Sequence, residues 1–523
     1  MFESNAIHME IAKQHYEHGL ELIEQTDWSA AVREFREVIR LLPHHAGAHF
    51  HLGDALRGLG DLDSAIAEYR ASLGLDPEDV DASWAHYYIG VIQQKRGDLG
   101  SALAEYSAAV KLNRDHARAH HGIGTIFLQR GEADSAKSEL RAAVEADPQF
   151  AAAYSDLGNV LLETGDVDAA IIEHRIAVRL DHKDADAHYN LAIALRKKGE
   201  LDEAILEFHV ALGLNPEDFD THCGLARTLM DKGELDAAVD EFRATIRNNP
   251  GRAEAHNSLA DALARKGEAN IALVEYATAL RIDPNHASAH RNTGVLLAQR
   301  GDMKGAESEL RAALRSDPNY ADAYSDLGAV LLQRGALDNA IDTLRIAVQL
   351  QPHEARAHNN LAGALLEKGD LDSAVSELRA ALKIKPDYIS AHFNLSKLFY
   401  TKGDIASAIS ELRSLLQLNS GDIGARFQLA RMLAEQGNLQ DAIVEYHNLL
   451  QLEPNDATLH YNLGSILEQK GDLQGALERY RRGAELDPNG KVGQAAKVRL
   501  KELTGESLLG RVGRALRSFM SVR

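Results

Sequence analysis

Histidine is the residue whose type and spacing in this sequence come closest to a chemical site. His116 and His120, like His286 and His290, are four residues apart, which puts both rings on one helix face where they could bind a metal ion. Eleven of the 24 histidines, however, share one position of a 34-residue spacing, and packing between helices explains a ring that recurs in this way. We therefore expect no metal and no cofactor. The recurring histidines are His15, His49, His86, His120, His188, His222, His256, His290, His358, His392 and His460.

No other group of residues points to catalysis. The sequence contains no glycine-rich phosphate loop, no HExxH motif and no GxSxG motif. Cys223 is the single cysteine, so an intrachain disulfide is impossible and a reducing compartment fits. A run of about 18 or more apolar residues and a secretory signal are both missing from the sequence, which favours a cytoplasmic location. We predict that the chain is not an enzyme.

The residue after the recurring histidine, here called the first inner position, offers a different chemistry. Helical geometry points it away from the core side, so large rings there could anchor a bound peptide in a groove. The alternative is that the same rings pack on a neighbouring helix. Aromatic residues gather towards the two ends of the series and polar residues fill most of its middle. The aromatic members are Tyr16, Phe50, Tyr87, Tyr189, Phe393, Phe427 and Tyr461.

The next residue, here called the second inner position, is often asparagine. An asparagine side chain offers a donor and an acceptor, so a row of them could bind an extended peptide main chain whatever its sequence. Gly122, Gly224 and Ser258 interrupt the row, which makes the stretch from Asn360 to Asn462 the best candidate. The alternative is that asparagine is only the consensus of the repeat. The candidates are Asn190, Asn292, Asn360, Asn394 and Asn462.

Pairs of helices must position these residues. Each 34-residue unit carries a small residue late in its first apolar segment, a turn glycine seven residues on, and an alanine five residues further. In the unit around Gly369 and Ala374, apolar residues recur at helical spacing on both sides of the glycine. Glycine allows the left-handed turn, and the small residues allow close helix contact. We count fourteen units over residues 12–490, with Thr26 in place of the first turn glycine and three extra residues near 80–82.

These marks resemble the tetratricopeptide repeat, and the resemblance covers about nine-tenths of the chain. It implies an all-α, right-handed α-solenoid of about fourteen helix-turn-helix units with a concave groove that binds proteins. Within the family, "AHNNLA" and "AYSDLGAVL" are most similar to the repeat superhelix of O-linked N-acetylglucosamine transferase. That resemblance implies an asparagine ladder along the groove. The catalytic domain of that enzyme has no counterpart here.

Part of the array is present twice. "YSDLGNVLLETGDVDAA" at 154–170 returns as "YSDLGAVLLQRGALDNA" at 324–340, and residues 117–218 resemble residues 287–388 unit by unit. The offset of 170 residues is five units. A block of repeats was therefore duplicated as the array grew, which by itself marks no site.

The charge is divided between an acidic array and a basic end. Net charge is −21, while residues 491–523 alone carry +6. An acidic body disfavours nucleic acid and makes a basic partner plausible. We expect residues 1–11 to be an N-terminal extension, 491–503 a capping helix, and 504–523 a basic amphipathic tail. The tail could contact a membrane surface, dock in an acidic groove or be disordered.

Three functions fit these features. The first is a protein-protein interaction scaffold or adaptor that binds peptide or helical segments of partners in its groove. The second is a substrate-recognition subunit of a separately encoded glycosyltransferase or other modifying enzyme. The third is a self-associating structural protein. The sequence ranks the first highest and leaves the identity of the partner open.

Overall fold

The computed structural model describes residues 2–78 and 80–504, and every regular element within them is an α-helix. The helices divide between two compact parts, residues 1–268 and 269–523. The N-terminal part contains α1 (Phe2–Glu24), α2 (Trp28–Leu41), α3 (Ala46–Leu59), α4 (Leu62–Leu75), α5 (Val80–Lys95), α6 (Leu99–Leu112), α7 (Ala117–Gln129), α8 (Ala133–Ala146), α9 (Ala151–Glu163), α10 (Val167–Leu180), α11 (Ala185–Lys198), α12 (Leu201–Leu214), α13 (Phe219–Lys232), α14 (Leu235–Asn248) and α15 (Ala253–Arg265).

The C-terminal part continues the same alternation of first and second repeat helices. It contains α16 (Ala269–Ile282), α17 (Ala287–Gln299), α18 (Met303–Ser316), α19 (Ala321–Gln333), α20 (Leu337–Leu350), α21 (Ala355–Lys368), α22 (Leu371–Ile384), α23 (Ile389–Thr401), α24 (Ile405–Leu418), α25 (Ile423–Glu435), α26 (Leu439–Leu452), α27 (Ala457–Lys470), α28 (Leu473–Leu486) and α29 (Lys491–Leu503).

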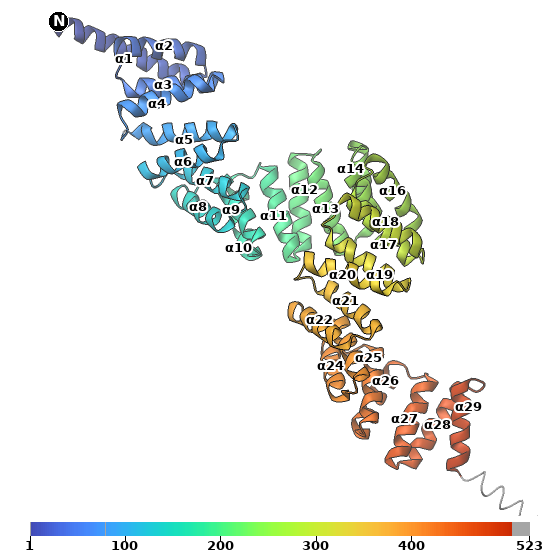
Figure 1. Cartoon of the computed structure of the whole chain (residues 1–523). Coiled ribbons are helices and arrows are strands. Elements are labelled where there is room, and N and C mark those ends of the chain that lie inside the picture. Colours follow the sequence, from blue (N-terminus) through green and yellow to red (C-terminus); the bar gives the residue numbers. More distant parts are fainter. Residues whose placement is uncertain (1, 79, 505–523) are drawn as a thin grey trace, which may run out of the picture. The chain divides into compact units, whose positions relative to one another are not determined.

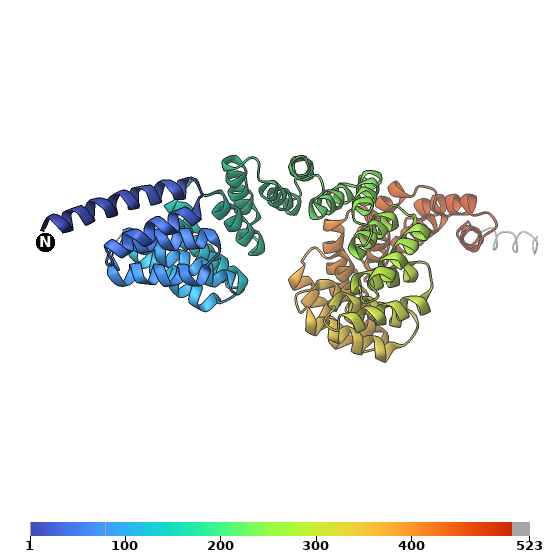
Figure 2. The ribbon, with the colours of Figure 1, turned by 90° about the horizontal axis from the view of Figure 1, so that it is seen from above.

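Within each part, every helix packs against its neighbours in sequence, and first helices also touch the first helices of adjacent repeats (Figure 1). Seen from above, the yellow-green to orange hairpins of the C-terminal part follow one another along a curved path (Figure 2). The predicted all-α solenoid of helix-turn-helix repeats is confirmed.

The turn glycines behave as the sequence predicts. All thirteen, from Gly60 to Gly471, have φ between 73° and 92°, the left-handed region where a Cβ is unfavourable. Thr26 replaces the first of them and is the sole described non-glycine residue with positive φ, at 58°. An aspartate then caps many second helices, as where Asp370 accepts a hydrogen bond of 3.2 Å from the Ser373 backbone N–H.

The small residues bring the two helices of each repeat together. The alanine of the second helix is 0% exposed in all fourteen repeats, Ala31 and Ala374 among them. The small residue of the first helix faces a large side chain sixteen positions on. A Cβ at Gly328 would lie 2.4 Å from Leu344, and one at Gly158 would lie 2.5 Å from His174. Both expected close contacts are therefore present.

The ends and the insertion have simple structures. The three extra residues near 80–82 lengthen α5 to 16 residues at its N-terminal end. Residues 2–11 continue α1 as regular helix. Helix α29 packs on α27 and α28 and buries Ala496 completely. The expected basic tail lies outside the described residues from 505 onwards. Among the helices that are described, none is both long and apolar enough to span a membrane.

His174 is an unusual occupant of the core. It is 0% exposed, and neither ring nitrogen has a hydrogen-bond partner among the described residues. Burial lowers the pKa of its imidazole to about 4, against 6.5 for an ordinary histidine. The equivalent residues of other repeats are apolar or aromatic, including Leu140 in the preceding repeat and Leu344 in the duplicated one.

We predict that Ala374→Leu destabilises the repeat formed by α21 and α22. The added side chain has no space at a fully buried helix contact, so the cost should be about 1–3 kcal/mol. Hydrogen exchange of α21 and α22 measures this local stability. Ser376→Leu, at an exposed position of the same helix, is the control and should change little. Equal exchange rates in the two variants would contradict the close-contact account.

We predict that His174→Leu removes a pH dependence of stability. Because the folded-state pKa is depressed, the unfolded chain takes up a proton that the folded chain does not, and stability falls as pH drops from about 6.5 towards 4. From pH 8 to pH 5 the wild type should lose about 2 kcal/mol more than the variant in the affected repeats. Denaturant unfolding at both pH values measures this difference. Parallel losses in both proteins would mean that His174 is protonated in the fold.

Candidate partner-binding surface

Most of the recurring histidines contact a glutamate on the second helix of their own repeat. His358 Nδ1 lies 2.6 Å from Glu377 Oε2 on the second helix, and its Nε2 lies 3.0 Å from the Pro352 carbonyl oxygen in the preceding turn. His392 makes the same two contacts, with Glu411 at 2.6 Å. At the equivalent His120, hydrogen bonding to Glu139 raises the pKa of the ring.

An exchange of residue type supports this role. Arg426 stands at the histidine position of its repeat, where its guanidinium group donates to Glu445 at 2.6 Å and to the Ser420 carbonyl at 2.6 Å. These partners occupy the same repeat positions as those of the histidines. In the described part of the chain, no group of three or more His, Cys, Asp or Glu side chains could hold a metal ion. Packing within the repeat therefore accounts for the histidine series.

The aromatic first inner residues divide into packed and accessible ones. Six of them contact an aromatic core residue nineteen positions on, with ring centroids 5.5–6.1 Å apart. Phe50 is only 5% exposed, because the rings of His51, Tyr69 and Tyr88 surround it. Its expected place on an open groove surface is therefore wrong. The half-buried members are Tyr16, Tyr87, Tyr189, Phe427 and Tyr461.

Phe393 is the most open aromatic residue of the series. It is 37% exposed on α23, and the core residue nineteen positions on is Leu412, so no ring packs against it from the second helix. Phe427 follows on α25, where it meets Tyr446 edge-on at 6.1 Å and remains half-buried. Phe393 is therefore the most exposed ring of the series in the C-terminal part, while Phe427 is half-buried like Tyr461.

The asparagines of the second inner position link neighbouring repeats. Asn360 Nδ2 donates to Ser325 Oγ at 3.2 Å, and Asn394 Nδ2 donates to Asn359 Oδ1 at 3.0 Å. Asn190 makes the same bond to Ser155 in the duplicated block, at 3.2 Å. Each acceptor is the first inner residue of the preceding repeat. The sequence alone did not indicate that Ser325, Asn359 and Ser155 accept these bonds. Donor and acceptor are 35 residues apart, and whether they meet depends on how neighbouring repeats stack.

Asn360 and Asn394 keep hydrogen-bonding capacity for another molecule. Asn360 and Asn394 are half-buried, and one amide hydrogen and the side-chain oxygen of each take no part in the bond to the preceding repeat. Asn462 lines a hollow of about 290 Å³ between α25 and α27, together with Tyr446 and Gln469. Asn292 lies half-buried on α17. The first helices thus present amide groups beside accessible rings.

Charge on this surface is largely compensated. Asp326 on α19 receives Arg291 at 2.7 Å and Arg356 at 2.7 Å, and Arg356 also reaches Asp322 at 2.6 Å. Beside Asp326 lies a hollow of about 220 Å³ between α17 and α19, lined by Val295, Ala298, Val330 and other side chains. The expectation of a basic partner thus rests on the net charge of the chain, since the Asp326 carboxylate already pairs with two arginines.

The N-terminal part carries a separate aromatic cluster on its first helices. Trp84, Tyr87 and Tyr88 of α5 form mutual ring contacts of 5.2–5.8 Å. Arg57 lies 4.2 Å over the Tyr88 ring, and His116 lies 4.4 Å from Trp84. Of the three rings on α5 the sequence pattern singled out Tyr87 alone as a groove residue, because Trp84 and Tyr88 belong to positions that elsewhere hold small or polar side chains.

Cys223 is built into the core. It is 4% exposed on α13, and burial raises the pKa of its thiol to about 12. A thiol that stays protonated at neutral pH is a poor nucleophile. The single cysteine therefore has no features of a catalytic residue.

Comparison with known proteins agrees with this architecture. Models described as "Tetratricopeptide repeat" match residues 16–80, 89–136, 121–181, 223–270, 265–321, 305–354, 325–389 and 393–448 in one case and 185–218 and 457–489 in another. A model described as "TPR repeat" matches residues 430–471. The chain belongs to the tetratricopeptide repeat family. A comparison with curated protein sequences finds no match.

The solved structures that match this chain include the following two. The "APC/C hetero-tetramer Cut9-Hcn1" is 17% identical, with a TM-score of 0.43, and the match covers 86% of this chain and 95% of that one. YrrB, described as "a TPR protein with an unusual peptide-binding site", is 25% identical, with a TM-score of 0.30, over 35% of this chain and 95% of its own.

We predict that Cys223 resists thiol reagents in the folded protein. Burial and the raised pKa both slow thiolate attack, so 5,5′-dithiobis(2-nitrobenzoate) should react with it only after urea unfolding. Ser376→Cys, which places a thiol at an exposed position of α22, is the positive control and should react at once. Rapid stoichiometric labelling of the folded wild type would contradict the buried placement.

Proposed function

We propose that the chain is a non-catalytic interaction scaffold that binds extended or helical segments of partner proteins along its first helices. In the C-terminal part the proposed contact surface runs over α21, α23, α25 and α27. Its members there are Asn360, Phe393, Asn394, Phe427, Tyr461 and Asn462. Tyr16, Tyr87, Tyr189, Asn190 and Asn292 are the corresponding candidates elsewhere in the chain.

The observation that carries the proposal is the combination of Phe393 with its neighbours. The Phe393 ring is 37% exposed and is next in sequence to Asn394, which bonds to Asn359 beside Asn360, and both Asn360 and Asn394 keep amide groups outside these bonds. An exposed ring can anchor an apolar side chain of a peptide, and asparagine amides can hydrogen-bond to the peptide main chain. The first helices repeat along the array, so neighbouring repeats present the equivalent positions to a bound segment.

We predict that replacing the accessible rings weakens partner capture. In a crosslinking pull-down, Phe393→Ala/Phe427→Ala/Tyr461→Ala should recover at least about tenfold less of a partner than wild type, because anchors of this kind dominate binding energy. Val444→Ala removes an apolar side chain that is 48% exposed on the second helix α26 and is the matched control. A partner retained equally by the triple variant would overturn the assignment of this surface.

The same experiment separates the remaining functions. A stoichiometric modifying enzyme among the captured proteins would favour the substrate-recognition subunit. Capture of the chain by itself, together with a mass above that of the 57.1 kDa monomer in light scattering, would favour self-assembly. The scaffold proposal expects a partner that is neither.

A further inference from the structure

One repeat of the C-terminal part has a charged residue where the array has an apolar one. The residue after the buried alanine of the second helix is apolar in twelve of the fourteen repeats, as at Ile341 and Ile409. The two exceptions are Lys137 and Glu307, which are equivalent residues of the duplicated blocks. Glu307 is only 7% exposed, so its carboxylate is buried at a core position. A buried charge of this kind is tolerated only when it is paired.

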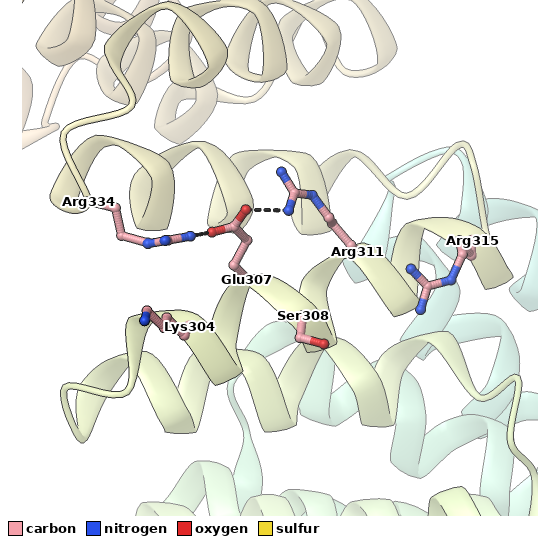
Figure 3. A pocket seen from close by; sticks show the side chains of 6 residues that line it. All are labelled: Lys304, Glu307, Ser308, Arg311, Arg315 and Arg334. Atoms are coloured by element: carbon pink, nitrogen blue, oxygen red, sulfur yellow. Dashed lines mark ion pairs between the residues drawn. The ribbon is translucent and has the colours of Figure 1, made fainter.

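Two arginines pair with this carboxylate. Arg311 lies one turn along α18, and Arg334 is the C-cap residue of α19 in the next repeat. Figure 3 shows the Glu307 carboxylate between the two guanidinium groups. Glu307 therefore fixes the direction of both arginines at the surface of α18.

The joint between these two repeats also breaks a regular ion pair. At five other joints an aspartate in the first turn of the second helix meets a lysine thirty residues on, as in Asp338 with Lys368 at 2.7 Å and Asp168 with Lys198 at 2.9 Å. Here the two positions hold Lys304 and Arg334, so both are cations. A pair that attracts elsewhere repels at this joint.

The result is a concentration of positive charge. A hollow of about 300 Å³ is lined by Lys304, Glu307, Ser308, Arg311, Arg315 and Arg334, here called the α18 basic pocket. Four cations face one carboxylate there, in a chain whose net charge is −21. Among the described residues, neither Lys304 nor Arg315 forms an ion pair, and the spacing of 304, 308, 311 and 315 places them along one face of α18.

We propose that the α18 basic pocket binds oxyanions of an acidic segment of a partner protein. Guanidinium groups match carboxylate and phosphate oxygens in two-pronged hydrogen bonds, and Glu307 holds two of them in place before a ligand arrives. The oxyanions come either from clustered carboxylates or from phosphoserine. The site lies mainly on the second helix α18, so it is distinct from the contact surface proposed on the first helices. The two proposals can be tested independently.

The duplicated block supplies a matched comparison within the same chain. The hollow at the equivalent place on α8 is lined by Asp134, Lys137, Ser138, Arg141, Ala142 and Glu145. Two cations and two carboxylates balance there, whereas the α18 basic pocket has three positive charges in excess. The two hollows share their fold position and a Ser–Arg pair but differ in charge.

The test measures fluorescence anisotropy of labelled peptides with the full chain at low salt. The probes are hexaglutamate, a glycine-serine peptide with one phosphoserine, and the unphosphorylated form of that peptide. Lys304→Asp/Arg315→Glu should weaken binding of an acidic probe by at least about tenfold, since it removes the two unpaired cations and restores the aspartate of the regular ion pair. Lys137→Glu/Arg141→Glu on α8 should change binding less than about twofold.

The set of outcomes decides the proposal. Binding of hexaglutamate alone identifies carboxylates as the ligand, and preference for the phosphoserine peptide identifies phosphate. Glu307→Ile, which restores the apolar residue of twelve repeats, should stabilise the repeat yet weaken probe binding several-fold, because Arg311 and Arg334 lose their anchor. No binding of either acidic probe, equal effects of the α8 and α18 variants, or equal binding of a single-stranded oligonucleotide would overturn it. Loss of probe binding with intact capture of a Phe393-dependent partner leaves the scaffold proposal standing.

Discussion

The structure depends on the contact between the two helices of each repeat. A fully buried alanine on the second helix and a small residue on the first allow the backbones to approach, and a glycine at positive φ turns the chain between them. Because the contact recurs along each part, at a spacing of 34 residues apart from the three extra residues near 80–82, each repeat presents the same positions to the same neighbours. The regular spacing therefore decides which side chains lie on the surface of each helix.

Repetition also explains why variation at single positions matters. At the repeat position that usually holds histidine, Arg426 contacts the same two partners, a glutamate on the second helix and a carbonyl in the preceding turn. The array therefore preserves the contact although the residue differs. Where a position is changed without such compensation, new surface chemistry results. Phe393 is open because its partner position holds Leu412, and the α18 basic pocket exists because Glu307 and Lys304 replace an apolar residue and an aspartate.

The sequence predicted the features that one repeat determines by itself. The turn conformation of Gly369, the exception at Thr26 and the burial of Ala374 follow from local spacing and residue size. Features that depend on two repeats were out of reach. Phe50 is covered by Tyr88 of the next repeat, and the bond from Asn360 to Ser325 spans 35 residues. Spacing along one helix fixes which face a residue occupies, but it does not say what the neighbouring repeat places over that face.

The central claim is that a partner bound at the Phe393 surface meets the first helices α21, α23 and α25, and not the second helices that lie between them in sequence. Hydrogen–deuterium exchange on a complex with a captured partner tests this directly, because first and second helices alternate along the chain and yield separate peptides. The account predicts added protection in α21, α23 and α25 around Asn360, Phe393 and Phe427, with α22, α24 and α26 unchanged. Protection confined to the second helices would contradict it.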